Sequence, residues 1–262
     1  SLDQIINNAA KWSYMFGGNS NPISLTIRMI IGRGWGQGPT HAQSLQSLFA
    51  HIPGLKVVMP SSPSDAKGLL ISSIFDPDPV IFLEHRWIHG IKEIVNPKFY
   101  KVPLKKCKKI STGDSLTIIT MSSMTIELKK IVNFLKTKKI YCDLIDLRTV
   151  APIDYTTIIT SIKKTNKILI VDSSHKNLSI SSQISSFLSE KYFKFLEQGP
   201  QIISLPDLPV PTSHALTKFY YPGSEEIIKK ILKMTNKNIK IDKKIFKKKE
   251  HDKPGDWFTG AF

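Results

Sequence analysis

The sequence predicts an α/β protein with two domains, each built on a parallel sheet that helices cover. Short apolar runs alternate with segments of helical periodicity along most of the chain, a pattern typical of βαβ units. The alternation is interrupted once, by a polar, lysine-rich stretch at residues 90–113 that contains Pro and Gly and resembles a domain linker. The chain has 262 residues, 41% hydrophobic and 22% charged, so it can bury two modest cores.

Helices and strands alternate in the first half of the chain. The periodicity predicts, in order, a helix, a buried strand, an amphipathic helix that carries His41, a strand, a helix and a strand. These six elements lie at residues 2–16, 23–31, 41–52, 55–59, 62–74 and 79–83.

The third helix has a well-defined start. Ser62 can accept a hydrogen bond from the first turn, Pro63 suits the first helical position, and Asp65 lies where the helix dipole favours negative charge. We therefore expect the helix to begin directly after Ser62.

The second half repeats the alternation on a smaller scale. The predicted strands and helices lie at residues 116–121, 125–135, 141–147, 155–162, 168–171, 180–188, 201–205 and 224–234. The resulting division is a first domain over residues 1–97, a linker over 98–114, a second domain over 115–234 and a basic tail over 235–262.

Charge and cysteine content narrow the functional classes. The net charge is +16, but the lysines crowd into the tail and the linker, without the interleaved aromatic residues of single-strand binders, so the composition speaks against a nucleic-acid function. Cys107 and Cys142 lack metal-ligand spacing, and we expect both to be reduced thiols. No segment approaches the roughly 20 apolar residues that span a bilayer.

The strongest candidate site is a glycine-rich loop followed by a histidine. The loop, residues 32–38, follows a strand and precedes a helix, but its spacing matches neither the dinucleotide fingerprint nor the P-loop. It suits a mobile loop at a substrate entrance, or simply a turn that needs positive φ angles. The entrance residues are Arg33, Gly34, Trp35, Gly36 and Gln37.

His41 follows this loop in the predicted first turn of a helix. The helix dipole there disfavours the imidazolium, so the neutral ring could donate to or accept from a substrate; the alternative is an ordinary exposed histidine. We interpret His51 as structural and His175 as an interface residue; for His85 and Arg86, at the end of a strand, we favour an ordinary role over a substrate or interface contact. The sequence contains no metal-binding cluster, no magnesium motif and no Ser-His-Asp or Cys-His grouping.

Several stretches together resemble one protein family. They include the loop and strand from Gly36 to Pro60 and the run from Ile145 to Asp154, Ile-Asp-Leu-Arg-Thr-Val-Ala-Pro-Ile-Asp. The matching segments are residues 2–18, 36–60, 60–70, 78–84, 145–154 and 207–212. In this order they are similar to the beta subunit of thiamine-diphosphate-dependent 2-oxo acid dehydrogenases, of the pyruvate dehydrogenase first-component type.

The resemblance implies a fold, a cofactor and a partner. The first domain would be the later part of a pyrimidine-binding-type domain and the second a transketolase C-terminal-type domain, with His41 as the catalytic residue near the cofactor. Thiamine diphosphate would be shared with an alpha subunit that holds magnesium, in an alpha2-beta2 heterotetramer, or this chain would form a homodimer. Some relatives bind potassium in a turn that matches Ser73, Ile74, Asp76 and Asp78.

The chain also departs from the family pattern. The family's activating glutamate lies before the opening helix, and no residue here can be assigned that role, so we expect this chain alone to be inactive. We expect a missing N-terminal segment, with a split gene or a degenerate subunit as alternatives. Residues 176–183 replace a glycine-rich stretch, and a lysine-rich tail follows the second domain, which leaves docking to an acyltransferase core open.

Three functions remain open at this stage. The leading one is decarboxylation of a 2-oxo acid, pyruvate first, with transfer of the acyl group to a lipoyl arm. The alternatives are a thiamine-diphosphate carboligase of the same family and a non-catalytic scaffold subunit with a basic interaction tail. The expected location is the cytoplasm, or the mitochondrial or plastid matrix in a eukaryote.

Overall fold

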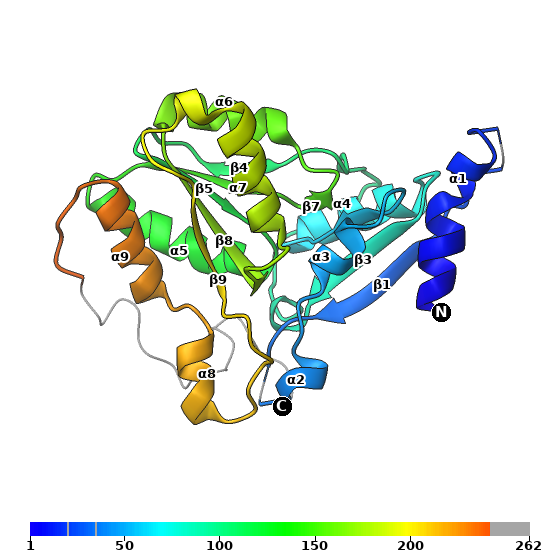
Figure 1. Cartoon of the computed structure of the whole chain (residues 1–262), viewed down its shortest axis with the longest axis horizontal. Helices are drawn as coiled ribbons and strands as arrows, with labels where there is room; N and C mark the ends of the chain where they lie inside the picture. Colours follow the sequence, from blue (N-terminus) through cyan, green and yellow to red (C-terminus); the bar gives the residue numbers. More distant parts are fainter. Residues whose placement is uncertain (20, 35, 242–262) are drawn as a thin grey trace.

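Two β-sheets, each with helices packed on it, lie side by side in the molecule (Figure 1). The structure is a computed structural model that describes residues 1–19, 21–34 and 36–241. Most of the predicted basic tail, residues 242–262, and Trp35 therefore lie outside the described residues. The fold class expected from the sequence, two α/β domains, is confirmed.

The first sheet contains three parallel strands and one strand from the second half of the chain. Its order is β1 (Thr26–Ile31), β3 (Val80–His85), β2 (Lys56–Val58) and β7 (Thr149–Ala151). β1 and β2 both pair with β3 in parallel, whereas β7 pairs with β2 antiparallel. The sheet is therefore mixed, and the second domain supplies its last strand.

The helices of the first half fall close to their predicted positions. The opening helix winds as three short pieces, the predicted third helix begins directly after Ser62, and the Ser62 hydroxyl accepts a hydrogen bond from the Asp65 amide at 3.2 Å. The helical segments are η1 (Gln4–Asn8), η2 (Ala9–Lys11), α1 (Trp12–Met15), α2 (Gly38–His41), α3 (Gln46–Ala50), α4 (Pro63–Ile74) and η3 (Arg86–Ile88).

The second sheet is larger and again mostly parallel. Its order is β4 (Lys108–Ser111), β6 (Cys142–Asp146), β5 (Leu116–Thr120), β8 (Ile168–His175) and β9 (Gln201–Leu205), with β4 antiparallel to β6. Its helices are α5 (Ser123–Thr137), α6 (Tyr155–Thr165), α7 (Ile180–Lys191), η4 (Phe193–Phe195), α8 (His214–Tyr220) and α9 (Ser224–Met234). The predicted strand at 201–205 and helix at 224–234 match β9 and α9.

Three local predictions differ from the structure. The strand at 26–31 is not buried: it lies at the sheet edge, where Arg28 is exposed and Ile30 is 62% exposed, because β1 has a neighbour on one side only. The end of the expected linker forms β4, because Lys108–Ser111 pairs with β6. The short helix α8 and strand β7 were not predicted, since neither is long enough to show a period.

A single apolar core continues from one domain into the other. Val57 and Ile81 of the first sheet and Ile119 and Ile145 of the second belong to the same buried cluster. Each fully buried aliphatic side chain contributes roughly 1.5–3 kcal/mol. The shared core therefore holds the two sheets in a fixed relative position.

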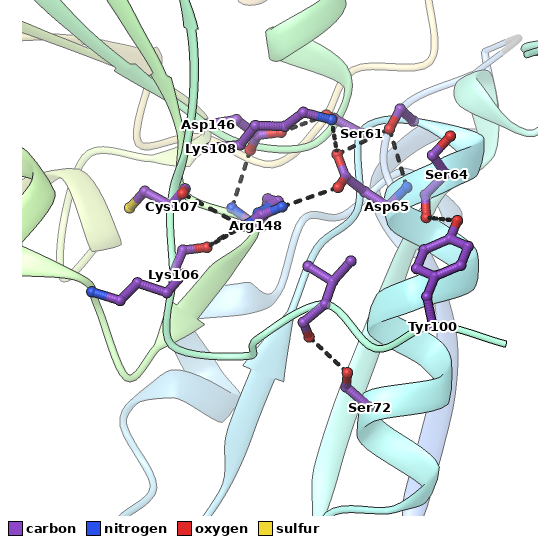
Figure 2. A network of polar contacts seen from close by, with 12 residues as sticks. Ser61, Ser64, Asp65, Ser72, Tyr100, Lys106, Cys107, Lys108, Asp146 and Arg148 are labelled. Carbon is purple, nitrogen blue, oxygen red and sulfur yellow. Dashed lines mark hydrogen bonds and ion pairs between the residues drawn. The ribbon is translucent and has the colours of Figure 1, made fainter. Parts of the chain in front are cut away.

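Buried polar contacts reinforce this junction (Figure 2). Asp65, at the start of α4, accepts a hydrogen bond from the Arg148 guanidinium at 3.1 Å and from the Lys108 ammonium at 2.8 Å. Arg148 also donates to the Lys106 carbonyl, at 2.9 Å from Nη2. Burial alone would raise the pKa of the Asp65 carboxyl, but its bonds to Lys108 and Ser62 and the charge of Arg148 outweigh burial and lower it.

A second buried carboxyl at the junction has the opposite shift. Asp146 accepts hydrogen bonds from the Ser61 hydroxyl and from the Arg148 amide. It has no exposed surface, and none of the described lysines bonds to it, so burial raises the pKa of Asp146 to about 6. The two neighbouring carboxyls differ because only Asp65 has hydrogen-bonded cations.

The two cysteines are unreactive thiols, and the described helices do not include a membrane span. Cys107 and Cys142 are both free, as expected, and burial raises the pKa of each thiol to about 12, which makes them unreactive. Among the helices in the described part of the chain, none combines the length and apolar character needed to cross a membrane.

Replacing Arg148 with alanine should lower the free energy of unfolding by about 1.5–3 kcal/mol, the usual contribution of a hydrogen bond to a charged group, because Lys108 remains bonded to Asp65. Urea denaturation followed by circular dichroism measures it. Arg28→Ala is the matched control: Arg28 pairs with Glu84 at 2.8 Å on the surface, and its loss should cost less than about 1 kcal/mol. Equal losses in the two variants would contradict the role assigned to Arg148.

The raised pKa of Asp146 predicts a pH effect between about 4 and 6. A carboxyl whose folded-state pKa lies above its unfolded value of about 3.9 makes the fold less stable as pH rises through this window. Asp146→Asn removes the ionisation, so the melting temperature of the variant minus that of the wild type should increase from pH 4 to pH 6 and then level. A difference that is independent of pH would show that Asp146 titrates normally.

Candidate active site at the domain junction

The glycine loop starts at the carboxyl end of β1, directly beside the end of β3. Ile31 and His85 are partners in the parallel register, and Gly32 follows with a φ of +92°. A Cβ atom at Gly32 would lie 2.1 Å from His85 Nε2. Only glycine fits here, because the imidazole of His85 fills the space that a side chain would need.

His85 is a buried neutral histidine. It is 2% exposed, and burial, with the nearby charges of Arg33 and Arg86, lowers the pKa of its imidazole to about 3. Its Nδ1 accepts a hydrogen bond from the Trp87 amide at 3.2 Å, so the single proton of the neutral ring resides on Nε2. His85 therefore supports the loop from beneath and is closed to solvent.

Arg33 connects the loop to both domains. Its guanidinium carbon lies 4.1 Å from the centroid of the Trp87 ring and 4.1 Å from the centroid of the Tyr221 ring. Trp87 follows β3 in the first domain, and Tyr221 follows α8 in the second. Two such cation–π contacts hold the loop across the junction.

Two further glycines let the loop approach the second domain. Gly36 and Gly38 both have positive φ angles, of +68°. A Cβ atom at Gly38 would lie 2.4 Å from the Thr212 hydroxyl, and one at Gly36 would lie 3.1 Å from the Thr212 carbonyl. The loop thus packs on the segment before α8, and its glycines permit this close contact.

His41 is positioned differently from the prediction. It is the last residue of the short helix α2, and a break over residues 42–45 separates it from α3, so the expected continuous helix is wrong. Tertiary contacts explain the break: Ala42 is buried against the second domain, and the Gln43 carbonyl accepts the Gly32 amide at 2.9 Å. Without a helix starting at His41, the dipole argument for a neutral ring does not apply.

The imidazole of His41 is nevertheless available for chemistry. The residue is exposed, and Arg86 Nη2 donates to its carbonyl at 2.6 Å, which fixes the backbone. Arg86 forms no ion pair with a described residue. Arg86 therefore holds a guanidinium beside His41 at the loop, and a guanidinium suits a ligand that carries a carboxylate.

A buried polar contact beneath the site was not predicted. The Gln46 amide donates to the Asp172 carboxyl at 2.9 Å, and the Ser174 amide donates to the same oxygen at 3.0 Å. Gln46 starts α3 in the first domain, while Asp172 lies in β8 of the second. Burial raises the pKa of Asp172, and the bonds from Ser174 and Gln46 oppose the shift. A polar residue within an otherwise apolar buried strand was the available sequence signal.

Two other predicted entrance residues lie beside the loop's neighbours: a Cβ atom at Gly34 would be 3.1 Å from the Arg86 side chain and 3.2 Å from that of Trp87, and Gln37 precedes α2 as its N-cap. Trp35 lies outside the described residues, and the entrance role of these residues stays a prediction.

The two other histidines interpreted from the sequence, His51 and His175, lie at the ends of other elements. His51 is the exposed C-cap residue of α3, consistent with the structural role expected for it. His175 lies at the end of β8, where its Nδ1 and the Pro206 carbonyl are 2.7 Å apart.

The turn matched to potassium directly precedes β3. It therefore lies at the amino end of that strand, whereas the glycine loop lies at the carboxyl end of the first sheet. The Lys56 ammonium bonds to Asp76 at 2.5 Å and to Asp78 at 2.9 Å. Burial opposes the charge of Lys56, yet these bonds outweigh it and raise its pKa. The Ile74 carbonyl accepts one bond, from Ser24 at 2.9 Å, and keeps a second lone pair. A cation at this turn would therefore use backbone carbonyls, because Lys56 already occupies the carboxylates.

Two family models match this chain, one in each half. The transketolase pyrimidine binding domain matches residues 2–88, and the transketolase C-terminal domain matches residues 105–227. A solved split-gene transketolase, described as an inactive beta4 tetramer, superposes with a TM-score of 0.71 at 17% identity, covering 90% of this chain and 71% of that one. The latter likeness shows a shared fold.

Curated relatives are more similar in sequence. The acetoin:2,6-dichlorophenolindophenol oxidoreductase subunit beta of Cupriavidus necator is 37% identical over 226 residues, 86% of this chain and 67% of the relative. The pyruvate dehydrogenase E1 component subunit beta of Rickettsia bellii is 34% identical over 89% of this chain and 72% of its own. The mitochondrial 2-oxoisovalerate dehydrogenase subunit beta of Dictyostelium discoideum is 40% identical over 85% and 60%.

The stacking of Arg33 predicts a measurable effect of Tyr221 on the loop. Tyr221→Leu removes one ring, and since a cation–π contact contributes about 0.5–2 kcal/mol, the Gly32 amide should exchange with deuterium roughly 2- to 30-fold faster. Hydrogen exchange resolved at the loop measures this. Tyr221→Phe keeps the ring and should keep the wild-type exchange rate; equal acceleration in both variants would assign the effect to the hydroxyl instead.

Proposed function

The chain belongs to the family of transketolase-type beta subunits of 2-oxo acid dehydrogenases, and from this premise we propose that it forms, with an alpha subunit, the site at which a 2-oxo acid is decarboxylated. The family, the fold class and the beta-type subunit role expected from the sequence are thereby confirmed. The identity of the substrate, the cofactor and the assembly belong to the proposal.

One observation carries the proposal: the loop with His41 is built by both domains together. β1 and β3 end beneath the loop, and Thr212 and Tyr221 of the second domain hold its far side. In α/β sheets, ligands bind where loops follow the carboxyl ends of strands. An exposed imidazole with a fixed backbone at this place suits proton donation to, or acceptance from, a bound oxo acid.

Thiamine diphosphate is the cofactor that the family implies. When bound, it supplies the carbanion that accepts the acyl carbon. Its activation needs a carboxylate, and the side chains packed on the described part of the loop are His85, Arg86, Trp87, Thr212, His214 and Tyr221. These residues alone do not fit that requirement, so we route no step through the cofactor. We propose that His41 contacts the substrate while residues 32–40 shape the entrance.

The Arg86 guanidinium beside His41 supports a carboxylate-bearing substrate, with pyruvate first. Relatives named for pyruvate, 2-oxoisovalerate and acetoin are all about equally similar, so the choice among them is a proposal. We propose an alpha2-beta2 heterotetramer with magnesium on the alpha subunit, potassium on the carbonyls of the turn at residues 73–78, and a location in the cytoplasm or an organelle matrix. Docking to an acyltransferase core remains part of the dehydrogenase proposal.

A non-catalytic scaffold is the second candidate, because the side chains nearest to the loop's described glycines, those of His85, Arg86, Trp87, Thr212 and His214, include none that could act as the activating carboxylate. A carboligase of the same family would share the site and differ only in the acceptor. Assembly with the alpha subunit, followed by assays for acyl transfer to lipoamide and to an aldehyde, separates the three. Decarboxylation of no 2-oxo acid by the assembled, full-length subunits would leave the scaffold.

The role of His41 predicts a specific kinetic effect. In the assembled enzyme, His41→Gln should lower kcat by about 10²- to 10⁴-fold, the usual contribution of a positioned acid or base, with a smaller change in KM. Steady-state decarboxylation of pyruvate with added thiamine diphosphate measures both. His51→Gln is the matched control, because His51 is exposed at the end of α3 and contacts no loop residue among those described. Equal kcat for the two variants would exclude His41 from the chemistry.

A further inference from the structure

A hollow lies on the second domain, and no residue of the glycine loop lines it. It has a volume of about 710 Å³ and lies along β9, between α9 and the end of α8. In Figure 1, α9 lies to the left of β9 and α8 lies below it. Ser204, Phe219 and Tyr220 contribute to its walls, and Phe219 is 79% exposed. We name this hollow the β9 groove.

The floor of the β9 groove is the edge of a sheet. Among the described strands, β9 is the last of the second sheet and pairs only with β8. One row of its backbone N–H and C=O groups therefore has no strand partner within residues 1–241, and such a row can pair with an added extended chain. The five residues of β9, Gln201–Leu205, correspond to an extended segment of about 17 Å.

The walls of the β9 groove are basic. Lys176 follows β8, and Lys230 and Lys233 lie three residues apart on α9, so both face the groove. These three ammonium groups form no ion pair with any residue that the structure describes. Lys229 also lines the groove but is paired with Glu225 at 2.9 Å. The acids present, Asp207 and Glu226, leave a net positive charge.

We propose that the β9 groove binds an extended acidic segment of a partner protein, which adds to the edge of β9 and places its carboxylates against Lys176, Lys230 and Lys233. The backbone edge supplies hydrogen bonds, the exposed Phe219 ring supplies apolar contact, and the lysines select acidic side chains. This surface is distinct from the candidate active site and does not depend on the proposed function.

The positive charge of the β9 groove distinguishes among three ligands that could bind there: a second copy of this chain, a small anion and an acidic segment. A second copy of this chain would bring the same basic edge, and lysines beside an unpaired strand repel such a copy. A small anion could pair with the lysines but would leave the strand edge without partners. An extended acidic segment satisfies the lysines and the edge together, and for this reason it is the occupant that we propose.

The test uses the full chain and a fluorescein-labelled eight-residue peptide of alternating glutamate and valine, with binding followed by fluorescence anisotropy. We expect saturable binding that weakens with salt. The double variant Lys230→Glu/Lys233→Glu should weaken binding at least tenfold. A peptide N-methylated at alternate positions, which keeps its charge but loses backbone donors, should also bind at least tenfold more weakly.

Matched controls make the outcomes decisive. Lys92→Glu/Lys98→Glu changes the charge equally on exposed residues of the other half of the chain and should leave binding unchanged. Equal weakening by this control would reduce the effect to general electrostatics and overturn the proposal. Unchanged binding of the N-methylated peptide would exclude strand addition. Displacement of the peptide by ATP at a lower concentration than by unlabelled peptide would assign the groove to a small anion, and a dimer in sedimentation that the peptide dissociates would assign it to a second copy.

Discussion

The first sheet depends on a strand that comes from the second domain. β7 pairs antiparallel with β2, and the Met59 amide donates to the Arg148 carbonyl at 2.7 Å just beyond this pairing. Because the same short segment leads from β6 of the second sheet to the edge of the first, neither sheet can shift without breaking hydrogen bonds in the other. The pairing of β7 with β2 fixes the relative position of the two sheets. The shared apolar core and the Asp65–Arg148 ion pair stabilise the sheets in that position.

The junction between the two domains also fixes the position of the candidate site's side chains. Arg33 can lie between Trp87 and Tyr221 only if the two domains keep their spacing, since each ring centroid is 4.1 Å from the guanidinium. The glycines at 32 and 38 then follow as a steric consequence, because His85 and Thr212 approach the backbone too closely for any side chain. A glycine-rich loop is often associated with mobility, but here glycine mainly permits close packing.

The sequence predicted the regular elements well where local signals are strong. Ser62, Pro63 and Asp65 marked the start of α4, and apolar runs marked the central strands of both sheets. The prediction was wrong where tertiary contacts determine the local structure. β1 has the composition of a buried strand but lies at a sheet edge. The helix expected through His41 breaks because Ala42 packs against the second domain and Gln46 bonds to Asp172 there. The contacts that define the site, from Arg33 to Tyr221 and from Gln46 to Asp172, join residues more than 120 positions apart. Periodicity and spacing describe neighbours along the chain, so they cannot report such pairs.

The large positive charge of the chain has different meanings at different places. Lys108 and Arg148 are matched by the Asp65 carboxylate, whose lowered pKa shows that the charges stabilise one another within the fold. Arg86 beside His41, and Lys176, Lys230 and Lys233 of the β9 groove, have no such acid among the described residues, although they lie beside a loop and a strand edge suited to ligands. Holding like charges together without a counter-charge costs free energy, and a bound anion recovers it. The unmatched cations, rather than the net charge of +16, therefore indicate where this chain is built to meet other molecules.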